Sequence, residues 1–214
     1  MKHRKTFSLY ASLSALLAFA VWTVLVCTVD VRPIGPLDSR IGLATLNGLI
    51  HRATGVNWTL YTLTDWFGLI PFAVALGFAC LGLYQWIKRK RLFLVDRSLF
   101  VLGGFYLAVI AVYVLFELVV INRRPVLIEG ILEASYPSST TLLVACVIPT
   151  ALMQTRSRLQ RKALRICVLI AGYAFVTFMV IGRIFSGVHW ISDIIGGAFL
   201  CVGLLFLYRY FETL

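Results

Sequence analysis

The segment from Gly182 to Asp193 contains the side chains best suited to chemistry. Arg183, His189 and Asp193 fall within eleven residues, at the junction of two apolar runs. His189 and Asp193 are four residues apart, so on a helix they share one face, where the carboxylate could hold one ring nitrogen and leave the other free to attack. The guanidinium of Arg183 could pair with phosphoryl oxygens. The segment therefore predicts a histidine nucleophile that handles phosphate at a membrane surface.

The composition is that of an integral membrane protein. Of the 214 residues, 60% are hydrophobic and only 14% are charged, and the mean hydropathy is +0.91, which leaves too little polar surface for a soluble domain. Six apolar stretches are long enough to cross a bilayer, which takes about 20 residues each. They cover residues 9–28, 66–87, 99–121, 138–153, 166–182 and 191–208. We predict an all-α, polytopic membrane protein in which residues 1–214 form one bundle of six transmembrane helices.

The basic residues predict the orientation of this bundle. The net charge is +11, and fourteen of the 20 basic residues fall before the first span, between spans two and three, between spans four and five, or after the sixth. The positive-inside rule makes that side cytoplasmic. Both termini are then cytoplasmic, Arg183 and His189 are extracytoplasmic, and a bacterial plasma membrane is the expected location. This distribution fits topology signals and argues against a nucleic-acid partner.

The longest extracytoplasmic connection covers residues 29–65. Within it, residues 41–53 alternate apolar side chains such as Ile41 and Leu46 with polar ones such as Asn47 and His51. This pattern is typical of an amphipathic helix that lies in the membrane interface. The helix could be a lid over the site or a packing element.

A second polar cluster lies between the third and fourth apolar stretches, on the same predicted side as His189. It consists of Asn122-Arg123-Arg124-Pro125, followed by Tyr136-Pro137-Ser138-Ser139-Thr140-Thr141. Pro137 suits the first turn of a helix, where unpaired N–H groups and hydroxyls favour a phosphate. Ordinary capping of the fourth span is the alternative interpretation.

The order and spacing of these segments resemble the three-part signature of the type-2 phosphatidic-acid phosphatase superfamily. The first part is Arg124-Pro125, the second is Pro137-Ser138, and the third joins Arg183 to His189 and Asp193. The superfamily includes membrane lipid phosphatases and, more distantly, soluble vanadium haloperoxidases. The resemblance covers about the last half of the chain. It implies a six-helix core with the site at the non-cytoplasmic face.

The resemblance also implies a role for each matched residue. His189 would be the nucleophile that forms a phospho-histidine, and Asp193 would orient it. Arg124 and Arg183 would bind the phosphoryl group, in a cradle completed by Ser138 and by the N–H groups of Ser139 and Thr140. No metal or cofactor is implied, and the five cysteines form no Cys-x-x-Cys pair that would suggest a metal site.

Two positions depart from the family pattern. Glu117 stands where the family usually has a lysine, and Thr140 stands where it usually has the histidine that protonates the leaving group. Threonine cannot serve as that acid near neutral pH. Glu117 would repel phosphate unless it pairs with an arginine such as Arg123 or Arg124. Possible alternative proton donors on the predicted extracytoplasmic side are His51, Glu117, Glu129, Glu133 and Tyr136.

Three functions remain open at this stage. The first is hydrolysis of a polyprenyl diphosphate of the undecaprenyl type, because its leaving group is a phosphate monoester whose second pKa is about 6 and which departs with little protonation. The second is a phosphatase or phosphotransferase acting on a lipid monophosphate with a non-standard general acid. The third is a catalytically impaired protein that binds or moves a lipid. Charge topology and motif order together predict that Arg124, Ser138, Arg183, His189 and Asp193 converge at the outer membrane face.

Overall fold

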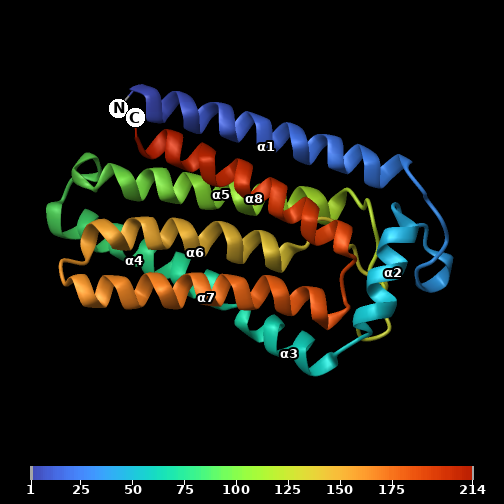
Figure 1. Cartoon of the computed structure of the whole chain (residues 1–214). Helices are drawn as coiled ribbons and strands as arrows, with labels where there is room; N and C mark the ends of the chain where they lie inside the picture. Colours follow the sequence, from blue (N-terminus) through green and yellow to red (C-terminus); the bar gives the residue numbers. More distant parts are fainter. Residues whose placement is uncertain (1, 214) are drawn as a thin grey trace.

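The computed structural model describes residues 2–213, and its long helices run side by side along one axis (Figure 1). Eight α-helices and two short 3₁₀ turns lie in the described part of the chain. They are α1 (Lys2–Thr28), η1 (Pro36–Asp38), α2 (Ala44–Thr54), α3 (Trp58–Phe67), α4 (Ile70–Arg89), η2 (Leu92–Leu94), α5 (Arg97–Leu118), α6 (Ser139–Arg158), α7 (Lys162–Ser186) and α8 (Ile191–Glu212).

Five helical segments of the described chain are long and apolar enough to cross a membrane. They are His3–Thr28, Trp58–Arg89, Arg97–Leu118, Lys162–Ser186 and Ile191–Glu212. The protein is therefore an all-helical integral membrane protein, but the predicted count of six spans is not confirmed. The second segment also starts earlier than predicted, because α3 continues into α4 through a turn at Gly68 and Leu69.

The remaining predicted span corresponds to α6, and its low hydropathy has a physical reason. Twelve of its 20 residues are buried, since α6 packs against α4, α5, α7 and α8. A helix that is surrounded by other helices contacts protein rather than lipid, so it tolerates polar side chains such as Thr150 and Gln154. Thr150 bonds back to the carbonyl oxygen of Cys146 at 2.8 Å.

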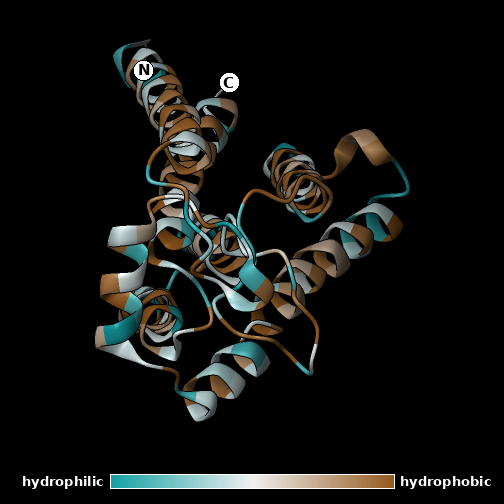
Figure 2. Cartoon of the chain, turned by 90° about the vertical axis from the view of Figure 1, so that its right-hand side faces the viewer, coloured by the Kyte–Doolittle hydropathy of each residue, from teal (hydrophilic) through white to brown (hydrophobic). Residues whose placement is uncertain are grey.

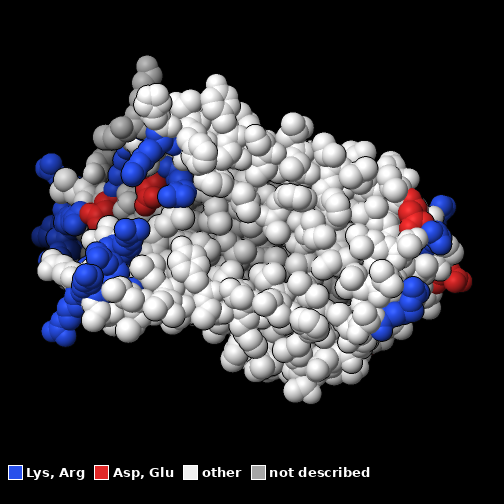
Figure 3. All heavy atoms as spheres, viewed as in Figure 1, with Lys and Arg blue, Asp and Glu red and all other residues white. Residues whose placement is uncertain are grey.

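Charged side chains gather at the two ends of the bundle. On the face shown in Figure 3, Lys and Arg concentrate at the end that holds both termini, a few charges of both signs lie at the other end, and none is visible in the broad band between. Helix α2, which covers most of the segment expected to form an interfacial helix, crosses the bundle at the end opposite the termini (Figure 1).

Figure 2 shows this loop end from the side of α2, with hydrophilic residues in the connections. A buried hydrogen-bond network joins the connections to α8. Asn47 of α2 donates to the Ser192 hydroxyl at 2.9 Å and accepts from the Ser192 N–H at 3.1 Å. Asn122, in the 119–138 loop, accepts from the Gly42 N–H at 3.3 Å. Three segments distant in sequence are thereby fixed around the start of α8.

Gly187 makes the turn between α7 and α8. Its φ of 67° is left-handed, a region that a side chain disfavours. An added Cβ would also lie 1.9 Å from the carbonyl oxygen of Gly55, at the end of α2. The turn therefore requires glycine for two independent reasons, and it determines where the two following residues, Val188 and His189, are placed.

We expect Gly187→Ala to destabilise the protein and to displace His189, because left-handed strain alone costs about 1–3 kcal/mol and the contact with Gly55 must also open. Thermal unfolding in detergent measures the loss. Gly77→Ala is the matched control, since a Cβ there meets nothing within 4 Å and alanine favours the helix. Equal melting temperatures for the two variants would contradict this account of the turn.

Candidate active site

His189 lies in the turn before α8, not on the helix itself, so the expected one-face pairing with Asp193 on a single helix is corrected. The α7 helix ends at Ser186 and α8 starts at Ile191, because the chain reverses at Gly187. The His189 ring is buried, and its Nδ1 lies 3.9 Å from Oδ2 of Asp193. That distance allows electrostatic attraction but is too long for a hydrogen bond. Within residues 2–213, neither ring nitrogen has a hydrogen-bond partner.

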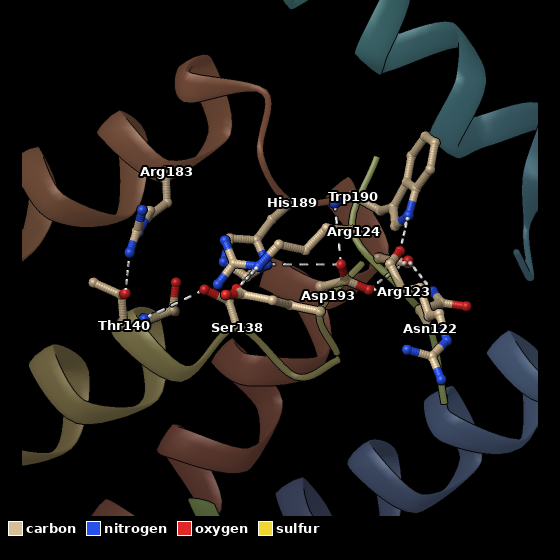
Figure 4. A network of polar contacts seen from close by, with 12 residues as sticks. Asn122, Arg123, Arg124, Ser138, Thr140, Arg183, His189, Trp190 and Asp193 are labelled. Atoms are coloured by element: carbon tan, nitrogen blue, oxygen red, sulfur yellow. Dashed lines mark hydrogen bonds and ion pairs between the residues drawn. The ribbon is translucent and has the colours of Figure 1, made fainter. Parts of the chain in front are cut away.

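The Asp193 carboxylate is fully buried and caps the start of α8. Its Oδ2 accepts the backbone N–H of Trp190 at 3.0 Å, and its Oδ1 accepts from the Asn122 side chain at 3.2 Å. The Ser138 N–H donates to the Asp193 carbonyl oxygen at 3.2 Å. Asp193 thus fixes the turn that carries His189 and ties the 119–138 loop to α8. Figure 4 shows these groups gathered at one place.

Arg183, in the last turn of α7, is 1% exposed. Its Nη2 donates to Oδ1 of Asp65 at 3.0 Å and to the Thr140 hydroxyl. The guanidinium also lies 5.3 Å from the centre of the Tyr61 ring, a favourable cation–π arrangement. One edge of the guanidinium is therefore anchored. Nε and Nη1 are buried with no hydrogen-bond partner in the described chain.

Arg124 enters the site from the 119–138 loop. Its Nε lies 2.9 Å from Oε2 of Glu133, and its backbone N–H donates to the Glu133 carbonyl oxygen at 3.1 Å. The side chain is 10% exposed, and Nη1 has no hydrogen-bond partner among the described residues. Like Arg183, Arg124 is held by a carboxylate and keeps unused donors.

The start of α6 lies beside the two arginines, as Figure 4 shows for Thr140 and Arg183. Ser138 caps the helix by accepting the Thr141 N–H at 3.4 Å, while Ser139 and Thr140 form its first turn, where N–H groups lack acceptors within the helix. A cavity of about 550 Å³, which we call the arginine cavity, opens here. Its polar walls include Asp65, Glu117, Arg124, Glu133, Thr140 and Arg183.

The electrostatic surroundings of His189 favour a neutral ring. Burial lowers the pKa of His189 well below its ordinary value, and the positive charges of Arg124 and Arg183 lower it further. The Ser135 carbonyl opposes the shift. An unprotonated imidazole is the form that can attack phosphorus.

His51 and Tyr136, two of the alternative acids, lie outside the arginine cavity. His51, on α2, packs its ring 5.3 Å from the Trp190 ring, and burial lowers its pKa. Tyr136 is buried, bonds the Thr23 hydroxyl at 2.7 Å and stacks on Phe19, and burial raises its pKa. Glu117 and Glu133 both line the arginine cavity. The expected pairing of Arg124 is made by Glu133 instead.

Sequence reasoning missed Asp65 and Tyr61, which α3 places against Arg183. They are four residues apart and share a helix face. The available signal was the position of Asp65, an acidic residue inside the apolar segment Trp58–Arg89, because charged residues in such segments mark functional positions.

Comparison with known proteins tests the family resemblance. Residues 120–213 match the family model described as the PAP2 superfamily. All seven predicted cradle and catalytic residues lie inside this PAP2 region, whereas Glu117, Asp65 and His51 lie outside it. PAP2 phosphatases are phosphoric-ester hydrolases.

A solved PAP2 structure has the same fold. It is a transmembrane PAP2-type phosphatidylglycerolphosphate phosphatase from Bacillus subtilis, with a TM-score of 0.62 and 23% sequence identity. The match covers 95% of this chain and 96% of the other. The search of curated protein sequences found no match. The similarity therefore establishes a membrane PAP2 fold for nearly the whole chain.

We expect Asp65→Asn to lower kcat/KM about ten- to hundredfold, because a hydrogen bond to a charged group contributes about 1.5–3 kcal/mol and the variant loses the ion pair that anchors Arg183. Hydrolysis of a lipid phosphate in detergent measures this. Asp38→Asn, in an exposed position of η1, is the control. Activity of Asp65→Asn equal to that of Asp38→Asn would show that Arg183 needs no anchor from α3.

The pH profile should report the surroundings of His189. Since its pKa is lowered, kcat/KM should persist below pH 6.5, the ordinary histidine pKa, and fall only when the ring becomes protonated. Arg183→Ala removes a positive charge near His189, which raises the pKa of the ring. The fall of kcat/KM on the acid side of the pH profile, its acid limb, should then move to higher pH. Arg183→Lys keeps the charge and should leave the limb in place. Identical acid limbs in both variants would contradict the assigned cause.

Proposed function

We propose that the protein is a lipid phosphatase that transfers a phosphoryl group to His189. The observation that carries this proposal is the set of unused donors on Arg183 and Arg124 beside a neutral, unpartnered imidazole. Buried guanidinium N–H groups without partners are costly. Phosphoryl oxygens are the matching acceptors, since guanidinium and phosphate pair with two parallel hydrogen bonds.

The proposed reaction has two steps. A ring nitrogen of His189 attacks phosphorus and the bond to the leaving oxygen breaks, while Arg124 and Arg183 neutralise the phosphoryl oxygens. Water then attacks the phospho-histidine, which releases inorganic phosphate and restores the imidazole. The Asp193 carboxylate attracts the positive charge that develops on the ring, although its hydrogen bonds also give it a structural role.

We place the site on the extracytoplasmic face, with both termini cytoplasmic and α6 as a sixth span. The support is the concentration of basic residues at the end that holds the termini. The length of α6, 20 residues, matches the thickness of a bilayer, and its burial accounts for its polar side chains. This orientation gives the protein access to lipid phosphates of the outer leaflet.

Within the family activity, we propose a polyprenyl diphosphate as the substrate. The residue in the usual general-acid position, Thr140, has its hydroxyl bound to Arg183. A diphosphate releases a phosphate monoester, whose departure depends on protonation far less than that of an alkoxide, so it is less affected by the absence of the usual histidine. This choice of substrate is supported by the chemistry of its leaving group.

His189→Ala should reduce phosphate release from a polyprenyl diphosphate to the background rate, because no other residue replaces the nucleophile. Asp193→Asn should reduce it partly, since the amide retains the shape but not the charge. Phosphate release by purified protein measures both. Wild-type-like turnover of His189→Ala would exclude the mechanism.

A substrate panel then decides among the functions. We expect faster release from the diphosphate than from phosphatidic acid. Faster hydrolysis of phosphatidic acid would instead establish a monophosphate phosphatase with another proton donor. If neither lipid were hydrolysed but a phospholipid bound and Arg183→Ala weakened that binding, the protein would be a lipid-binding member of the fold.

A further inference from the structure

Three carboxyl groups line the arginine cavity, and they come from three separate segments. Asp65 belongs to α3, Glu117 to the end of α5, and Glu133 to the 119–138 loop. Asp65 and Glu117 lie outside the PAP2 region. Negatively charged walls would weaken the binding of an anion in this cavity. The presence of each carboxyl group therefore needs a separate explanation.

Ion pairs with arginines explain two of the three carboxyl groups. Asp65 lies 3.0 Å from Arg183, and Glu133 lies 2.9 Å from Arg124. Each of these carboxylates anchors a guanidinium, which accounts for its presence in the cavity wall. Glu117 is different, because within residues 2–213 it has no hydrogen bond and no ion pair within 4.0 Å.

Glu117 lines the cavity into which a leaving group would depart. His189 is buried and does not line the arginine cavity, whereas Arg124, Arg183 and Thr140 do. In an in-line displacement the leaving oxygen points away from the nucleophile. It therefore points into the cavity, whose lining includes Glu117.

We propose that Glu117 is the proton donor to the leaving oxygen, which gives the protein a second activity on lipid monophosphates. This inference rests on the proposed phosphatase function and extends it beyond diphosphates. As His189 bonds to phosphorus and the phosphorus–oxygen bond breaks, the Glu117 carboxyl transfers its proton to the alkoxide and an alcohol leaves. In the second step its carboxylate takes a proton from the attacking water, so that inorganic phosphate is released and both side chains return to their starting forms.

The other titratable groups around the cavity fit this role less well. Thr140 is bound to Arg183, and its hydroxyl has no suitable pKa. The Tyr61 ring is covered by the Arg183 guanidinium. Glu117 thus takes over the function of the missing histidine from a different helix, since Thr140 is on α6 and Glu117 is on α5.

The test compares two monoesters in the same purified protein, a long-chain alkyl phosphate and para-nitrophenyl phosphate. The alkoxide needs a proton, whereas the nitrophenolate leaves without one. We expect Glu117→Gln to lower the ratio of alkyl to nitrophenyl turnover by about 10²- to 10⁴-fold, the usual contribution of general acid catalysis. Glu129→Gln, the same change at a loop position outside the cavity, should leave the ratio unchanged.

Each other outcome has a defined meaning. If Glu117→Gln lowers turnover of both esters equally, Glu117 acts through structure or binding and the inference is overturned. The same follows if the unmodified protein hydrolyses the polyprenyl diphosphate but not the alkyl phosphate, in which case the proposed function stands. If no substrate is hydrolysed faster than by His189→Ala, the proposed function fails and this inference fails with it.

Discussion

The site depends on burying two positive charges at one end of a membrane helix bundle. Arg183 and Arg124 are 1% and 8% exposed, and removing a guanidinium from water costs several kcal/mol unless it is paired. The protein compensates in part, with one carboxylate for each arginine. It leaves other guanidinium donors unused, and those donors select a ligand rich in negatively charged oxygens.

The same charges control the neighbouring imidazole. Burial lowers the pKa of His189, and the two neighbouring cations lower it further, which favours the neutral ring. Neutrality is the condition for attack on phosphorus, so the groups that bind phosphate also keep the nucleophile in its reactive form. The Asp193 carboxylate accepts hydrogen bonds from the Trp190 N–H and from the Asn122 side chain, and these bonds hold the turn in place.

The sequence indicated which residues lie together at the site better than it indicated the structure that supports them. Short spacing within one segment identified Arg183, His189 and Asp193, and motif order added Arg124 and the start of α6. The sequence could not show where α3 lies, because no local pattern indicates that Asp65 contacts Arg183, 118 positions away. It also placed His189 and Asp193 on one helix, since no local pattern indicated the left-handed turn at Gly187, where an added Cβ would meet the Gly55 carbonyl oxygen. Similarly, α6 looks like an ordinary apolar stretch, and only packing reveals a helix enclosed by its neighbours.

The central claim is that His189 carries the phosphoryl group, and trapping that intermediate tests it most directly. The purified protein would be mixed with a polyprenyl diphosphate, quenched in alkali during turnover, and digested for mass spectrometry, with Asp193→Asn included to slow the second step. We predict a phosphate on an imidazole nitrogen of the peptide that contains His189, and its disappearance once the substrate is exhausted. Steady turnover without any phosphorylated His189, or with the phosphate on another side chain, would contradict the account.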